Sequence, residues 1–189
     1  MVPLGRVSAT AAAVVAANLQ ALLGLNTLVV RPWPEPSPCL VPTRGQYDAS
    51  LILRELAPEG ESGALRLGLI NHDLCLSFLT FVFGEAQLGG RAAVVSLHRL
   101  QDLDDGSRAP QALFLGRLAK VGLHETAHVL DLPHCRAPGC LMRFSGGLAE
   151  LDRLGLEFCP ACQSRLAVGR ARIRRGEVRA PAGAGPGLG

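Results

Sequence analysis

A stretch rich in histidine and cysteine near the C-terminal end constrains the fold of this chain more than any other feature. Residues 124–128 read His-Glu-Thr-Ala-His, a further histidine stands at position 134, and four of the six cysteines lie between positions 135 and 162. Imidazole nitrogens and thiolates are typical zinc ligands in proteins. If the chain uses these groups as ligands, its helix, turn and loops must converge on them.

The first part of this stretch has the spacing of a metal site on a helix. His124 and His128 lie in Ala112 to Leu130, a segment without proline that predicts a helix. Residues four apart share one helical face, where two imidazoles can bind one zinc ion. Glu125 is placed to accept a proton from water at the metal. His134 needs a turn of the chain to reach the same point, and the proline before it helps to end the helix. The alternative is that the histidines cap or pack a core helix.

The cysteines form a second group. Cys135 and Cys140 are separated by four residues, and Cys159 and Cys162 by two, which gives the ligand set of a closed structural zinc site. Two disulfides or inert buried thiols are the alternative. His134 adjoins Cys135, and neighbouring side chains can point apart, so one loop can serve two metal ions. The remaining cysteines and histidines show no ligand spacing, and we expect free thiols and surface or core histidines there: Cys39, Cys75, His72 and His98.

Composition bounds the class of protein. The 189 residues are 48% hydrophobic and 19% charged, which predicts a single globular domain with a sizeable core. The net charge of +3 gives little information about partners. No apolar run reaches the roughly 18 residues of a membrane-spanning helix, so we expect no membrane partner.

The N-terminal segment has two interpretations. Thr10 to Ala17 is apolar and follows Arg6, which is typical of a secretory signal. Asn18 and Gln20 interrupt this segment, and leucines continue it at helical spacing, so we expect an amphipathic first helix from Leu4 to Leu25 that packs on a sheet. A chain without a signal stays in the reducing cytoplasm, where thiolates remain available to a metal.

Further patterns predict alternating elements. Beside the two helices above, the sequence predicts helices at Tyr47–Leu56 and Ala161–Ile173 and strands at Thr27–Val30, Ala64–Ile70, Phe78–Phe83 and Ala92–Leu97. The last residues, Arg174 to Gly189, are rich in glycine, proline, alanine and arginine, and we expect a solvated tail. An arginine arm that binds nucleic acid is the alternative, although no aromatic residue there could stack on bases.

The combined pattern resembles the signature of the archaemetzincins, His-Glu-x2-His-x2-Gly-x3-Cys-x4-Cys-x-Met-x17-Cys-x2-Cys, with a histidine before the first cysteine. The likeness extends over most of the chain, from about Leu19 to Ala167. The chain matches the signature at His124, Glu125, His128, His134, Cys135, Cys140, Met142, Cys159 and Cys162.

The resemblance implies a compact metzincin-like α/β domain. A mixed, twisted sheet would pack on helices, including the helix with His124 and His128, and a C-terminal subdomain would form around four cysteines. Two zinc ions per chain are implied, one catalytic and bound by the three histidines, the other structural and bound by the cysteines. Glu125 would act as general base, and Met142 would form the Met-turn beneath the catalytic zinc. A peptide would lie antiparallel to an edge strand, for which Phe81–Ala86 is the candidate.

The same resemblance sets the domain boundaries. We expect a single peptidase domain at residues 1–168, made of an upper sheet and helix part (1–130) and a lower zinc-rich part (131–168). Residues 169–189 would form a flexible basic tail rich in glycine, proline and alanine.

The chain departs from the signature at one position that bears on the metal site. Asp131 replaces the glycine that allows a sharp turn off the helix, often with positive φ. Aspartate tolerates this conformation better than most residues, so we expect Asp131 to form the turn. The alternative is that its carboxylate approaches the zinc or orients a ligand histidine. Between Met142 and Cys159 the chain is one residue shorter than the signature, which a loop deletion explains.

These observations predict a cytoplasmic, monomeric zinc metallopeptidase that hydrolyses short peptides. An aminopeptidase mode needs an acidic residue for the free amine, and Asp73, Glu85 and Asp102 are candidates that the sequence does not distinguish. The alternative function is a non-catalytic, zinc-stabilised module that binds a peptide or a protein. A nucleic-acid-binding zinc ribbon ranks last because it leaves the residues at 124–128 without a role, so we expect no nucleic-acid partner.

Overall fold

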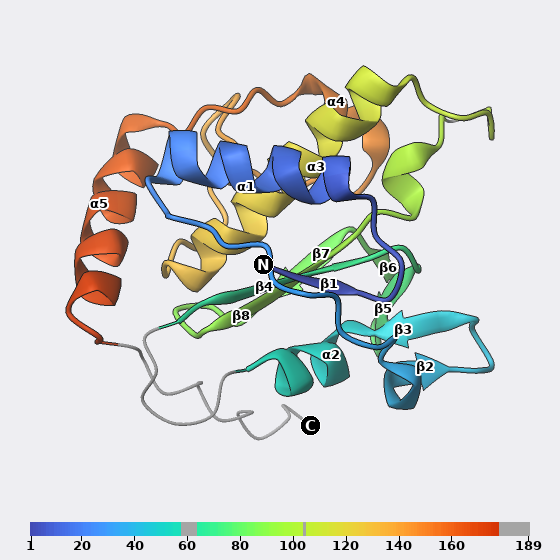
Figure 1. The fold of residues 1–189 in the computed structure, drawn as a ribbon. Coiled ribbons are helices and arrows are strands. Elements are labelled where there is room, and N and C mark those ends of the chain that lie inside the picture. Colours follow the sequence, from blue (N-terminus) through green and yellow to red (C-terminus); the bar gives the residue numbers. More distant parts are fainter. Residues whose placement is uncertain (58–63, 104, 178–189) are drawn as a thin grey trace, which may run out of the picture.

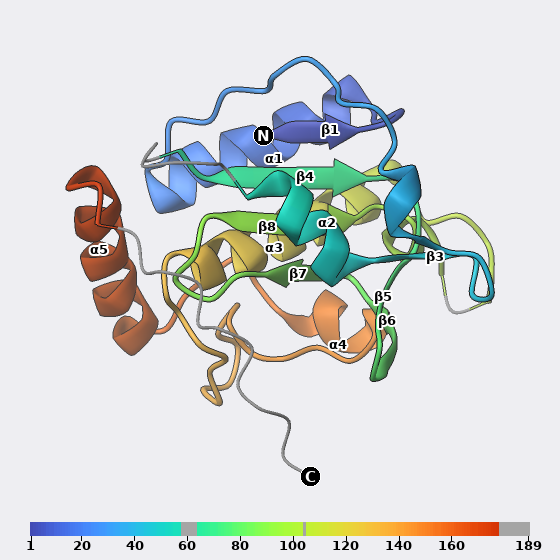
Figure 2. The same ribbon diagram turned by 90° about the horizontal axis from the view of Figure 1, so that it is seen from below.

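A mixed four-stranded sheet is the centre of the fold. The computed structural model describes residues 1–57, 64–103 and 105–177. Three strands of this sheet are parallel, and the fourth runs antiparallel at one edge, next to the third (Figures 1 and 2). In spatial order the strands are β1 (Val2–Leu4), β4 (Arg66–Ile70), β8 (Ala92–Ser96) and β7 (Gly84–Ala86).

A second, smaller sheet lies beyond the carboxyl ends of the parallel strands. Its strands β5 and β6 form an antiparallel hairpin, and the chain passes directly from β6 into the edge strand β7 of the first sheet. In spatial order the strands are β2 (Leu40–Val41), β3 (Gln46–Asp48), β5 (Leu74–Leu76) and β6 (Leu79–Val82).

Helices cover both faces of the first sheet. Helices α1 (Ala9–Leu23) and α3 (Gln111–Val129) pack on one face, and α2 (Ala49–Leu56) packs on the other (Figure 1). Side chains alternate along the strands, so that Val95 joins the core under α1 and α3 while Val94 joins the core under α2. The predicted α/β class, a mixed sheet packed on helices, is confirmed.

The N-terminal residues differ from the prediction. Leu4, the expected start of the first helix, instead ends β1, an edge strand parallel to β4, and Ser8 caps a helix that begins at Ala9. The predicted strand at 27–30 is wrong: no strand is assigned there, and Leu28 is 74% exposed. A β-branched run forms a strand when it can pack on a neighbour, and this one crosses the surface.

Short elements link the helices to the site. One-turn 3-10 helices occur at Ser37–Cys39 and Arg99–Gln101, and a short helix, α4, at Leu148–Arg153. The guanidinium of Arg117, buried on α3, donates from Nε and Nη2 to the carboxylate of Asp152 on α4 at 2.7 and 2.6 Å. Because α4 follows the segment that carries Met142, this pair fixes that segment against α3.

The last helix, α5 (Pro160–Arg174), extends past the predicted domain boundary at residue 168. It packs on the end of α3 through Gly169, where an added Cβ would lie 2.3 Å from the carbonyl oxygen of Leu130. This backbone contact keeps residues 169–174 in the folded domain, contrary to the assignment of a tail from residue 169. Residues 178–189 of the predicted tail lie outside the described residues.

We expect Asp152→Asn to weaken the fold in a pH-dependent way. The hydrogen bonds from Arg117 lower the pKa of the Asp152 carboxyl below its ordinary value of 3.8. The folded pKa is therefore the lower one, so the stabilisation is present above pH 4 and is lost as pH falls through the folded pKa. At pH 7 the variant should lose about 2 kcal/mol, because a buried guanidinium loses its charged partner.

Urea denaturation from pH 2.5 to pH 7 tests this expectation. The stabilities of the two proteins should converge at the acid end. Glu177→Gln is the matched control, because its carboxylate pairs with Arg175 at the surface. A constant difference between Asp152→Asn and the parent protein across the whole pH range would contradict the assignment.

Candidate active site and metal centres

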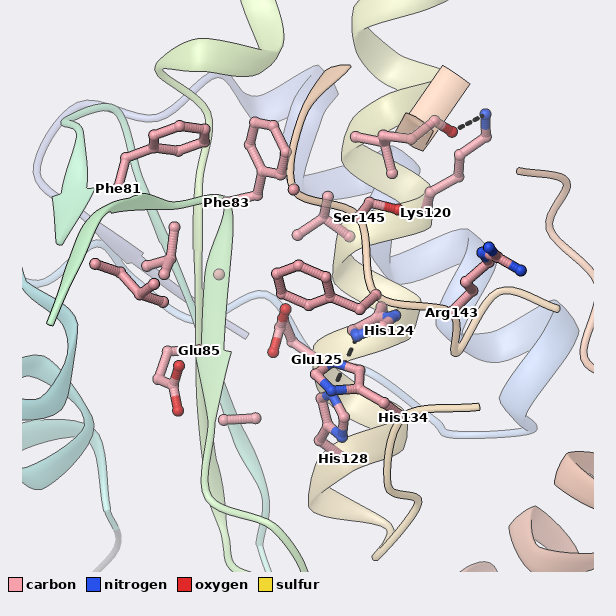
Figure 3. A pocket seen from close by; sticks show the side chains of 18 of the residues that line it. Phe81, Phe83, Glu85, Lys120, His124, Glu125, His128, His134, Arg143 and Ser145 are labelled. Atoms are coloured by element: carbon pink, nitrogen blue, oxygen red, sulfur yellow. Dashed lines mark hydrogen bonds between the residues drawn. The ribbon is translucent and has the colours of Figure 1, made fainter. Parts of the chain in front are cut away.

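Three imidazoles converge at the end of α3. His124 and His128 lie on one face of the last two turns of the helix, and the chain turns back so that His134 lies beside them (Figure 3). One ring nitrogen of each histidine lies within 4.8 Å of those of the other two. The three predicted histidine ligands are thus together in space.

Backbone carbonyl groups fix the orientation of two rings. The Nδ1 atom of His124 donates to the carbonyl oxygen of Leu141 at 2.7 Å, and that of His128 donates to the carbonyl oxygen of Leu132 at 2.6 Å. Since Nδ1 carries the proton, each Nε2 atom presents a lone pair. The two Nε2 atoms face each other at 3.0 Å. Two lone pairs at this distance repel unless a cation lies between them, so the donor set fits a zinc ion.

Burial keeps these rings neutral. It lowers the pKa of His124 to about 3, with a further contribution from the neighbouring His128, and it lowers the pKa of His128 to about 4. Burial also lowers the pKa of His134. A neutral imidazole is the form that binds a metal, so near neutral pH protons do not compete for this site.

The turn that leads to His134 is made by Asp131. Its φ of 73° is in the left-handed region, and it is the only non-glycine residue with positive φ in the described part of the chain. Its N–H donates to the carbonyl oxygen of His128 at 2.8 Å, and its carboxylate pairs with Arg172 of α5 at 3.0 Å. The expected role as turn former is therefore confirmed, and the carboxylate is directed to α5.

Glu125 lies between α3 and the edge strand β7, on the same side of β7 as the histidines (Figure 3). Its residue is 8% exposed, and burial raises the pKa of its carboxyl well above the ordinary value, with a smaller contribution from Glu85. Its Cγ atom packs closely on Gly84: a Cβ atom added to Gly84 would lie 2.6 Å from this Cγ atom. The arrangement holds a carboxyl group beside the helix face that carries His124 and His128.

The four predicted thiolate ligands also come together, with their sulfur atoms within 4.8 Å of one another. Backbone N–H groups support them: Ala137 donates to the Sγ atom of Cys135, and Cys159 donates to that of Cys140, each at 3.4 Å. None of these cysteines forms a disulfide. Cys162 lies in the first turn of α5, so this helix begins at the cysteine cluster, which consists of Cys135, Cys140, Cys159 and Cys162.

The segment of Met142 contacts both the group of three histidines and the group of four cysteines. The side chain of Met142 is fully buried, and its carbonyl oxygen accepts a hydrogen bond from the N–H of Cys135 at 2.8 Å. The residue before it, Leu141, supplies the carbonyl group that orients His124. The segment predicted as the Met-turn therefore connects the histidine cluster with the cysteine cluster through two of its backbone carbonyl groups, which accept from the His124 ring and from the N–H of Cys135.

A cleft of about 560 Å³ runs past the histidines. Its wall is formed by β6 and β7 on one side and by the segment after Met142 on the other. Several aromatic and aliphatic side chains make this wall mainly apolar: Phe78, Leu79, Phe81, Phe83, Leu88 and Phe144. Phe78 is 79% exposed and Phe144 is 61% exposed, so the rim offers apolar surface to a ligand.

The predicted edge strand Phe81–Ala86 is divided between two sheets. Phe81 belongs to β6 of the smaller sheet, and Gly84–Ala86 forms β7 of the larger one. Hydrogen bonds to β8 involve the carbonyl group of Phe83 and the N–H of Gln87. By the antiparallel alternation, the backbone groups of Gly84 and Ala86 point away from β8, toward the free edge. This part of the segment offers unpaired backbone groups to a ligand beside Glu125.

Sequence reasoning missed two contributors to the site. The residues around Gly84 show no pattern that marks this glycine as necessary. Only the folded structure shows that Glu125 packs where a side chain at position 84 would lie. Arg172 is one of many arginines, and only the folded chain shows that it pairs with Asp131. In the sequence, the only sign of such a partner was Asp131 itself, a charged residue at the position where the signature has a glycine.

The fold and the two clusters define a zinc metallopeptidase with a thiolate cluster beside its active-site helix. Residues 60–168 match the model of peptidase family M54. The archaemetzincin of Archaeoglobus fulgidus is 38% identical over 68% of this chain and 73% of its own length, and that of Methanopyrus kandleri is 41% identical over 70% and 71%. The chain therefore belongs to peptidase family M54, the archaemetzincins, as its signature predicted.

Solved structures agree with this assignment. The crystal structure of the Archaeoglobus fulgidus archaemetzincin in complex with malonate matches with a TM-score of 0.76 at 33% identity, over 87% of this chain and 97% of that chain. A zinc-dependent peptidase from Methanocorpusculum labreanum matches with a TM-score of 0.76 at 29% identity, over 88% and 100%. In the described part of this chain, no helix has the length and apolar character to cross a membrane.

We expect Gly84→Ala to destabilise the protein, because the new methyl group would meet both Glu125 and, at 2.8 Å, the carbonyl oxygen of Val94. The loss should be about 1–3 kcal/mol in the free energy of unfolding of the zinc-loaded protein. Gly116→Ala in α3 is the matched control, because no atom lies within 4 Å of its added Cβ. The control should gain about 0.5–1 kcal/mol from helix propensity. Equal stabilities for the two variants would show that β7 and α3 are not in close contact.

Proposed function

We propose that this chain is an active peptidase whose catalytic zinc is bound by His124, His128 and His134, with Glu125 as the general base. The observation that carries the proposal is the pair of Nε2 lone pairs that face each other at 3.0 Å beside a buried carboxylate. A core histidine pair would place a proton between its nitrogens, and here both Nδ1 protons are directed to carbonyl groups.

Each group of residues at the site has a separate role in the proposed reaction. Zinc, when bound by the three imidazoles, supplies a Lewis acid that polarises a peptide carbonyl and acidifies water. Glu125 accepts the proton of the attacking water and donates it to the leaving amine nitrogen. The free backbone groups of Gly84 and Ala86 pair with the peptide as an added strand, which aligns the scissile bond along α3.

A second zinc ion has a structural role in this proposal. Cys135, Cys140, Cys159 and Cys162 would hold it in a closed site, and Met142 would pack between the two sites as the Met-turn. Thiolates retain a metal only when they stay reduced, which supports a cytoplasmic location. A cleft bounded by one chain's own elements supports a monomer.

The substrate class follows from the cleft. Its apolar wall and exposed phenylalanines favour peptides with apolar side chains near the scissile bond. Of the carboxylates considered for a free amine, only Glu85 lines the cleft. Asp73 is bonded to Arg99, and Asp102 pairs with an arginine outside the cleft. Glu85 is therefore the residue that an aminopeptidase mode would use.

The alternative is a zinc-stabilised module that binds peptides in the same cleft without hydrolysing them. It is supported by the Cys cluster and the free strand edge alone. It gives no role to a carboxylate buried next to three histidines, so we rank it second.

We expect Glu125→Gln to lower kcat by about 10²–10⁴-fold, because the amide cannot accept a proton. Zinc content should stay unchanged, since the ligands remain. The change in kcat is measured on a library of short peptides with free and acetylated N-termini. The zinc content per chain is measured by elemental mass spectrometry.

Glu55→Gln is the matched control, because Glu55 lies on α2 at the other face of the sheet. It should retain full activity. If Glu125→Gln binds peptides and cleaves them as fast as the parent chain, the general-base role is wrong. If the parent protein binds peptides but cleaves none, the binding module is the better description.

A further inference from the structure

The turn at Asp131 is fastened to the last helix. The Nη1 atom of Arg172, near the end of α5, donates to the Oδ2 atom of Asp131 at 3.0 Å, and its Nη2 atom donates to the carbonyl oxygen of Gly89 at 3.4 Å. The side chains of the pair are 20% and 33% exposed. One guanidinium therefore connects α5, the end of α3 and the turn between β7 and β8.

The local backbone is built around this contact. A Cβ at Gly89 would lie 2.8 Å from the Oδ1 atom of Asp131, so the glycine leaves room for the carboxylate. The N–H groups of Gly89 and Asp131 both donate to the carbonyl oxygen of His128, at 2.9 and 2.8 Å. Gly169 allows α5 to approach the carbonyl oxygen of Leu130.

Asp131 needs such support because of its conformation. Its φ of 73° lies in the left-handed region, which aspartate tolerates better than most residues but adopts less freely than glycine. A strained backbone persists only when the surroundings hold it. The held turn leads directly to Leu132, whose carbonyl group orients His128, and then to His134. A change at residue 131 therefore reaches two of the three proposed zinc ligands.

We propose that Arg172 is a positioning residue for the histidine zinc site, acting through Asp131. Its guanidinium holds the turn in the left-handed conformation and so keeps the His128 ring and His134 in place. Because Cys162 lies in the first turn of α5 and Arg172 in its last turn, the same helix connects the cysteine cluster with the histidine cluster. The proposal rests on the proposed zinc site at the three histidines.

The proposal makes a specific claim about coupling. Glycine adopts positive φ without strain, so a chain with glycine at position 131 has no need of the guanidinium. Arg172→Ala should weaken zinc binding when Asp131 is present and have little effect in the Asp131→Gly background. An ion pair that only stabilises the surface would act on stability and leave zinc affinity unchanged.

The test is a double-mutant cycle on the full-length, zinc-loaded chain. The four proteins are the parent, Arg172→Ala, Asp131→Gly and the double variant. The zinc affinity of the labile site is measured by competition with a chromogenic chelator, and the visible spectrum of the Co²⁺-substituted protein reports the ligand geometry. Retention of the second, chelator-resistant zinc shows that α5 and the cysteine cluster are still folded.

We expect Arg172→Ala to lower the affinity of the labile site by about 10-fold, the low end of the range for residues that orient ligands. In the Asp131→Gly background the same change should alter affinity by less than about 2-fold, since the coupled partner is gone. Arg172→Lys should be intermediate, because an ammonium keeps the charge and lacks the planar fork that reaches both acceptors. Arg175→Ala is the matched control, since its guanidinium pairs with Glu177 at the surface of the same helix end.

Three results would overturn the proposal. Unchanged affinity in Arg172→Ala would remove the positioning role, and so would equal losses in the two backgrounds. In both cases the parent still binds a labile zinc that His134→Ala removes, so the proposed function stands. A parent chain without a labile zinc would overturn the proposed function and the positioning role together.

Discussion

The hydrogen bonds from the Nδ1 atoms of His124 and His128 to two backbone carbonyl groups are the interactions on which the site depends. They fix the tautomer and the direction of both rings, so that two lone pairs meet at one point. Each acceptor is itself held by the fold. The N–H of Leu141 donates to the carbonyl oxygen of Glu157, and the N–H of Leu132 donates to that of Ala127. The ligand geometry is thus carried by the backbone of three segments, and loss of their packing would release the rings.

The same packing accounts for the burial of Glu125, the proposed general base. Burying a carboxylate opposes folding, because the charged form loses its hydration. Glu125 is nevertheless buried, because α3 approaches β7 so closely that only a glycine fits at position 84. The core under α1 and α3, with Val95 and Leu123 fully buried, stabilises the fold enough to hold the carboxylate there. The buried carboxyl group lowers the stability of the fold, and the apolar core under α1 and α3 offsets this loss. Such a balance is common for enzymes.

Sequence spacing predicted the features that depend on near neighbours along the chain. The helix of His124 and His128 and the last helix were predicted within two residues of their ends, and the convergence of the thiol groups followed from their spacing. Features that depend on distant partners were missed. Strand β1 has three residues and is identifiable only beside β4, and the division of residues 81–86 between two sheets depends on β5 and β8. The contact of Arg172 with Asp131 spans 41 residues.

X-ray absorption at the zinc edge of the fully loaded protein tests the central claim, that the chain binds one zinc ion at an imidazole site and another at a thiolate site. A site of three nitrogens and one oxygen beside a site of four sulfurs predicts an average first shell of about two sulfur atoms at about 2.3 Å and about two lighter atoms at about 2.0–2.1 Å per zinc. A first shell of sulfur atoms alone would contradict the account, because the histidine cluster would then hold no zinc.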